Sequence, residues 1–130
     1  MNKITVELAG IYACAYRLCL KGYLPTLTPT GRFPRIDMLV YDPDKGCSVG
    51  LQVKTLQKKP GETNPWYFPP SNGHPTVYVT LDPLEFYVLS RESVDLIAKE
   101  IEKAPKGHRW VHKDSVEKPD TKDKWENIWK

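Results

Sequence analysis

Residues 35–56 constrain the fold more than any other segment, because their pattern predicts a β-hairpin inside a sheet. Residues 35–41 (RIDMLVY) are nearly continuously apolar, which predicts a strand that is buried on both faces. Residues 42–46 (DPDKG) supply a turn, and residues 48–56 predict the return strand. A hairpin of this composition requires helices or further strands to cover it.

Apolar residues at helical spacing predict that the segment before this hairpin, residues 3–21, is a helix with Asn2 as its N-cap. The apolar stripe of this helix comprises Ile4, Leu8, Ile11, Tyr12, Ala15, Leu18 and Cys19. Other strands are predicted at residues 23–29, 76–80 and 85–89, a short extra strand at 66–68, and a second helix at 90–103.

This order of elements predicts a single α/β (α+β) domain over residues 1–130, with a mixed central sheet of about five strands flanked by helices. Its core is expected at about residues 4–103. Residues 104–130 are expected to form a C-terminal extension with a short helix, capped near Asp120 or Thr121. The 130 residues fit one domain of ordinary size.

Composition narrows the class of protein only slightly. A net charge of +3 permits binding to nucleic acid without requiring it. Cys14, Cys19 and Cys47 lack the spacing of a zinc site, and the first two are expected to pack in the helix as small apolar groups. Reduced thiols predict a cytoplasmic protein. No run approaches about 18 apolar residues, so no membrane span is expected.

Four polar side chains fall at positions where they are expected to meet at the sheet: Glu7, Asp37, Gln52 and Lys54. Gln52 and Lys54 share one face of a predicted strand, roughly 7 Å apart along it. Asp37 lies on the adjoining arm of the hairpin. Glu7 falls at the margin of the apolar stripe, where the first helix meets the sheet.

This combination of side chains suits the hydrolysis of a phosphodiester bond. Carboxylate and amide oxygens bind hard divalent cations such as Mg²⁺. A bound cation lowers the pKa of its water and polarises the phosphoryl oxygen. A nearby lysine positions or deprotonates the attacking water, or offsets charge in the transition state. A second carboxylate on the helix holds an outer-shell water or a second ion.

The arrangement of a helical glutamate followed by Asp-(14 residues)-Gln-x-Lys on a hairpin resembles the PD-(D/E)XK nuclease superfamily. It is most similar to the subset of Holliday-junction-resolvase-like and restriction-endonuclease-like enzymes, and the resemblance covers roughly residues 4–90. Thr55 also fits a "QVKT" form of the motif. The resemblance implies a restriction-endonuclease-like core and a Mg²⁺- or Mn²⁺-dependent endonuclease that acts on DNA and forms a homodimer.

Residue roles also follow from this resemblance. It implies that Asp37 and Gln52 hold the metal with help from the backbone carbonyl of Val53. It implies that Lys54 acts on the water or the transition state, and that Glu7 supports a water or a second metal. Gln52 stands where the family has an acidic residue, so the site loses one negative charge. An active nuclease with a weaker metal site and a catalytically degenerate binding module therefore both remain open.

Two further alternatives concern the surface and the core. Basic residues at four positions are candidates for contacts with DNA phosphates: Arg32, Arg35, Lys58 and Lys59. Exposed basic residues are common, and each is also explained as ordinary solvated surface. In an unrelated α+β binding protein, Asp37 and Lys54 would instead form a purely structural pair across the hairpin.

Overall fold

Five strands form one mixed sheet in the computed structural model, which describes residues 1–28, 36–59, 61, 65–66, 69–71, 73–105 and 110–130. Within these ranges the elements are α1 (Lys3–Leu20), β1 (Leu24–Leu27), β2 (Met38–Asp42), β3 (Cys47–Lys58), β4 (Thr76–Asp82), β5 (Leu84–Leu89), α2 (Arg91–Lys103), α3 (Lys113–Val116) and the 3₁₀ helix η1 (Trp125–Trp129). The predicted fold class is confirmed.

The strands lie in chain order, β1-β2-β3-β4-β5, and only β3 and β4 run parallel. The predicted hairpin is β2–β3. Its turn is closed by the side chain of Asp42, which accepts hydrogen bonds from the N–H groups of Asp44 (2.9 Å) and Lys45 (3.4 Å). Gly46 supplies the positive φ of 68° that the turn requires. The parallel β3–β4 pair is what leaves a long connection between these two strands.

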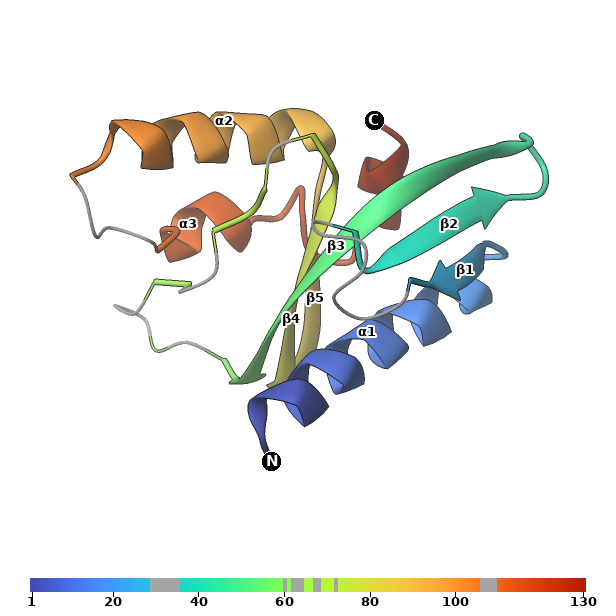
Figure 1. The fold of residues 1–130 in the computed structure, drawn as a ribbon, viewed down its shortest axis with the longest axis horizontal. Coiled ribbons are helices and arrows are strands. Elements are labelled where there is room, and N and C mark those ends of the chain that lie inside the picture. The colour runs from blue at the N-terminus through green and yellow to red at the C-terminus, as the bar shows by residue number, and fades with distance from the viewer. Residues whose placement is uncertain (29–35, 60, 62–64, 67–68, 72, 106–109) are drawn as a thin grey trace.

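Helices cover both faces of the sheet, but not along its whole width (Figure 1). One apolar core packs α1 and η1 against β2–β5, and a second packs α2 and α3 against β4 and β5. In β2 the burial alternates, with Leu39 and Tyr41 47% and 43% exposed. The prediction that this strand is buried on both faces is therefore wrong, because α2 and α3 do not extend over β2.

The face of α1 that meets the sheet is made of small residues. Its buried positions are Gly10, Cys14 and Leu18, whereas Ile4 and Tyr12 of the predicted stripe are exposed, as is Cys19. Ranking residues by hydrophobicity placed the contact on the larger side chains. The helix instead approaches the sheet where Gly10 has no side chain, and this close approach rotates the larger residues outward.

The C-terminal region contributes more than an extension to the core. Trp125 and Ile128 of η1 are buried in the same core as α1, and α3 was not predicted from the sequence. The tail helix begins after Lys124, later than Asp120 or Thr121. Among the helices of the described ranges, none combines the length and apolarity needed to cross a membrane.

Other predicted boundaries shifted by a few residues or fall partly outside the described ranges. The edge strand is shorter than predicted, and β3 extends two residues beyond residue 56. Trp66 is buried and forms an isolated bridge with Val111, while residues 67–68 of the predicted extra strand lie outside the described ranges.

Candidate functional site

The site lies at the N-terminal end of β2, where β3 continues past the first residue of β2. The last ladder pair is Met38 with Leu51, and the N–H of Asp37 donates to the carbonyl of Leu51 at 2.9 Å. Beyond this point β3 runs on to Lys58 and, within the described residues, pairs only with β4. Among these residues no strand adjoins the other edge of β3 from residue 52 onward, so backbone groups on that edge require other partners.

Asp37 occupies this edge. Its Oδ2 accepts a hydrogen bond of 2.7 Å from the N–H of Val53, which fixes the orientation of the carboxylate. Burial raises the pKa of Asp37 above its ordinary value, and the negative charge of Glu7 adds to this effect. The hydrogen bond from Val53 and the positive charge of Lys54 act in the opposite direction without cancelling it. A cation bound beside Asp37, in addition to Lys54, would stabilise the ionised carboxylate and lower its pKa.

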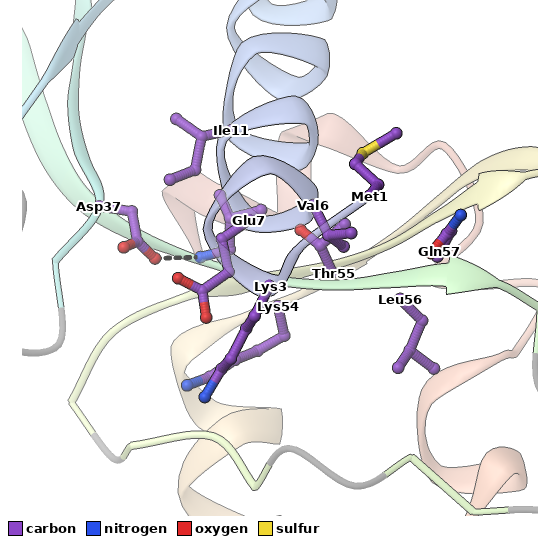
Figure 2. A pocket seen from close by; sticks show the side chains of 11 residues that line it. Met1, Lys3, Val6, Glu7, Ile11, Asp37, Lys54, Thr55, Leu56 and Gln57 are labelled. Atoms are coloured by element: carbon purple, nitrogen blue, oxygen red, sulfur yellow. Dashed lines mark hydrogen bonds between the residues drawn. The ribbon is translucent and has the colours of Figure 1, made fainter.

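A pocket of about 490 Å³ opens beside Asp37, between the start of α1 and the free part of β3. Glu7, Asp37, Val53 and Lys54 all line it, and Figure 2 shows the two carboxylates on the same side of the pocket. Its volume lies within the range of small-ligand sites in proteins. The structure thus brings together four of the five residues predicted for the metal and the chemistry.

Gln52 is the residue that the structure does not bring into the pocket. It is buried, and its Oε1 accepts hydrogen bonds from the N–H of Ser71 (3.2 Å) and the hydroxyl of Thr76 (3.4 Å). Gln52 shares a strand face with Lys54, as predicted, but the segment before β4 covers that face at residue 52. To reach a cation beside Asp37, the carboxamide must first release Ser71 and Thr76.

Asp37 and Lys54 do not form the structural ion pair of the alternative hypothesis. Among the described residues, ion pairs join Lys59 to Glu85 (3.1 Å) and Glu117 (3.6 Å), and Lys122 to Glu85 (3.2 Å). Lys54 is half-buried and has neither an ion pair nor a hydrogen bond with another described residue. Its ammonium group is therefore available to a ligand in the pocket.

The predicted DNA contacts have different surroundings. Arg32 and Arg35 lie outside the described residues. Lys58 is exposed at the end of β3. The Lys59 ammonium group is held by Glu85 and Glu117, and this contact ties the end of β3 to β5 and to the segment after α3. Of the four, Lys58 alone is described as a free basic side chain on the surface.

The oxygen donors present fit a divalent cation with few protein ligands. No group of three or more His, Cys, Asp or Glu side chains among the described residues is arranged to hold a metal. Asp37 and Glu7 supply two carboxylates. The N–H and C=O of a strand residue point to the same edge, so the carbonyl of Val53 is directed to the side of Asp37. Mg²⁺ commonly binds through one or two carboxylates and keeps several waters, which suits this set.

Lys3 and Thr55 are among the pocket residues to which the sequence prediction gave no role. Lys3 lines the pocket from the first turn of α1. Thr55 lines it from β3, and its buried hydroxyl has no hydrogen-bond partner among the described residues. Lys3 had one detectable signal in the sequence, since a cation in the first turn opposes the helix dipole. Nothing in the sequence marks the Thr55 hydroxyl as unpartnered.

Comparison with known proteins gives a result at the level of the fold. No protein-family model matches the sequence, and no curated protein matches it. Among solved structures, the chain is similar to the bacterial homing endonuclease I-Ssp6803I, with a TM-score of 0.63 and 15% sequence identity. The match covers 96% of this chain and 91% of the endonuclease. The chain therefore shares the fold of this structure over nearly its whole length.

Proposed function

We propose that this protein is a metal-dependent endonuclease that hydrolyses phosphodiester bonds in DNA. The observation that carries the proposal is the position of Asp37, which the Val53 N–H holds at the free edge of β3 in a pocket shared with Glu7 and Lys54. Likeness in fold to a homing endonuclease supports the choice of DNA as the substrate.

Asp37 and the carbonyl of Val53 would hold Mg²⁺ or Mn²⁺, with Glu7 holding a coordinated water or a second ion. A divalent cation at this place supplies Lewis acidity toward the phosphoryl oxygen and lowers the pKa of bound water. The Asp37 carboxylate is already oriented by its hydrogen bond to Val53, so little reorganisation is needed when the substrate binds.

Lys54 acts on the reacting groups in this proposal. Its ammonium group, which has no ion pair or hydrogen bond with another described residue, orients the attacking water or offsets the negative charge that develops on the phosphoryl oxygens. Because Asp37 and Glu7 are the carboxylates of the pocket, the lysine also keeps the site from repelling the phosphodiester. Loss of this side chain should lower the cleavage rate more than it lowers DNA affinity.

Cleavage of plasmid and branched DNA in Mg²⁺ and in Mn²⁺ tests the proposal directly. Asp37→Asn keeps an acceptor for the Val53 N–H, and Lys54→Met keeps the length of the side chain, so both variants should fold. Asp44→Asn and Lys45→Met change the same residue types in the exposed hairpin turn and are matched controls. We expect cleavage by the parent and both controls and its loss in both site variants. Equal activity in all five proteins would identify a contaminant and refute the proposal.

A catalytically degenerate DNA-binding module is the second candidate, and the engagement of Gln52 favours it. If the carboxamide stays bound to Ser71 and Thr76, the cation has one protein ligand fewer. This candidate predicts DNA binding that persists in the absence of divalent metal, with no cleavage of any DNA. It also predicts that Asp37→Asn, which removes a negative charge from the pocket, binds DNA at least as tightly as the parent.

We propose further that the active form is a homodimer in the cytoplasm, because cutting two strands needs two copies of the site. Large apolar side chains remain exposed on α1 and are available to a second copy: Ile4, Tyr12, Tyr16 and Leu20. Exposed, free thiols at Cys19 and Cys47 fit a reducing compartment. Sedimentation equilibrium of the parent and of Tyr12→Lys measures the association. A parent that remains monomeric at all concentrations would contradict it.

A further inference from the structure

Lys3 is placed where helix stability disfavours it. It lies in the first turn of α1, which contains no acidic residue, at the positive end of the helix dipole. Glu7 follows at i+4, and a lysine N-terminal to a glutamate is the weaker orientation of such a pair. Lys3 forms no ion pair with any residue that the structure describes. Its position therefore has no evident structural reason.

The Lys3 side chain lies in the same pocket as the proposed catalytic residues. Figure 2 shows the side chains of Lys3 and Lys54 extending in the same direction, from the helix and from β3, with Glu7 beside them. The pocket thus has two sides of opposite charge. Asp37 and Glu7 form a side for a cation, while the two lysines and the start of α1 form a side for an anion.

We propose that Lys3 binds a phosphate group of the DNA next to the one that is cut, an inference that rests on the proposed nuclease function. Its ammonium group contributes the charge of this contact. The contact fixes the register of the DNA backbone so that the scissile phosphate lies between Asp37 and Lys54. The pocket accommodates this because Lys3 and Lys54 approach it from different elements.

The binding test uses a short DNA duplex without added metal, so that nothing is cut. Lys3→Gln should raise the dissociation constant about threefold to tenfold and reduce the slope of log K against log salt by about 1. Lys99→Gln removes the same charge from an exposed position on α2 and should leave both quantities unchanged. Lys3→Gln binding that matches Lys99→Gln would refute the role of Lys3.

Cleavage kinetics distinguish this inference from the proposed function. For a positioning residue, Lys3→Gln should raise KM more than it lowers kcat. Cleavage by the parent with no effect of Lys3→Gln on binding or KM would overturn the inference and leave the nuclease function standing. Binding that depends on Lys3 in a protein that cuts no DNA would overturn the nuclease function and leave the phosphate contact standing.

Discussion

The contact between Gly10 and Thr55 sets the distance of α1 from the sheet, and Gly10→Ala tests this contact. A Cβ built at Gly10 would lie 1.9 Å from Oγ1 of Thr55, 2.7 Å from its Cγ2 and 2.8 Å from its Cβ. All three neighbouring atoms belong to one β-branched side chain with few rotamers, on a buried strand. The helix must therefore move away from β3 to accept even one methyl group.

Two opposing effects determine the sign of the change in stability. Helix propensity alone favours alanine over glycine inside a helix by about 1 kcal/mol. Overpacking of a core contact costs about 1–3 kcal/mol, and here the closest approach falls far below the 3.4 Å of ordinary contact. We expect the overpacking to exceed the propensity and the free energy of unfolding to fall by about 1–2 kcal/mol. The movement also carries Glu7 away from Asp37, so cleavage should fall with stability.

Urea denaturation of the parent, Gly10→Ala, Thr55→Gly and the double variant measures the contact. In the Thr55→Gly background the methyl group has room, so Gly10→Ala should become stabilising by about 1 kcal/mol. Destabilisation of the same size in both backgrounds would place its cause away from Thr55. A single Gly10→Ala variant that is more stable than the parent would refute the close packing of α1 on β3.

Four further variants test the site and its supports. Without metal, Asp37→Asn should stabilise the fold at neutral pH, because burial raises the Asp37 pKa; the gain should vanish in urea titrations as pH falls below the ordinary value of 3.8, where the parent is protonated in both states. Gln52→Ala should lower the free energy of unfolding by about 1–3 kcal/mol by removing the acceptor for Ser71. Gln52→Glu should lower the Mg²⁺ concentration needed for half-maximal cleavage if residue 52 is recruited to the cation, and leave it unchanged if Asp37, Glu7 and the Val53 carbonyl hold the cation without it. Glu85→Gln should destabilise by about 1 kcal/mol at neutral pH. Burial alone raises the Glu85 pKa, but hydrogen bonds from Tyr87 and two lysines bring it below its ordinary value; the difference between parent and variant should therefore close in thermal melts as pH falls below 4.5.

Local patterns in the sequence were sufficient to predict the strands and the hairpin. Turn residues predict the hairpin turn at residues 42–46, and short runs of apolar, β-branched and aromatic residues predict β4 and β5, in which successive residues are buried. Helix α1 was located correctly but its buried face was not, because hydrophobicity favours large residues while the contact uses Gly10. Leu39 and Tyr41 were wrongly predicted to be buried. How far a layer of helices extends over a sheet depends on the tertiary fold, and the sequence of one strand does not report it.

The candidate site divides in the same way between local and tertiary information. Glu7 was found from helical spacing and Lys54 from strand alternation. Asp37 was found from its unusual charge in an apolar strand. The hydrogen bond from Val53 to Asp37 requires that β2 start opposite Leu51 while β3 extends further, and no sequence pattern reports this difference in length. The part of β3 that β2 leaves unpaired also lines the pocket, so the fold and the proposed chemistry share one structural cause.

Gln52 shows why strand alternation alone cannot define a metal site. Gln52 and Lys54 have the same orientation on β3, yet Lys54 is at an open edge while Gln52 is covered by the chain that leads into β4. The difference arises because β4 runs parallel to β3, and its connection must return across the sheet beside residue 52. A site that recruits Gln52 must displace this connection, so its metal affinity would depend on Ser71 and Thr76 as well. A site built from Asp37, Glu7 and the Val53 carbonyl would be indifferent to both.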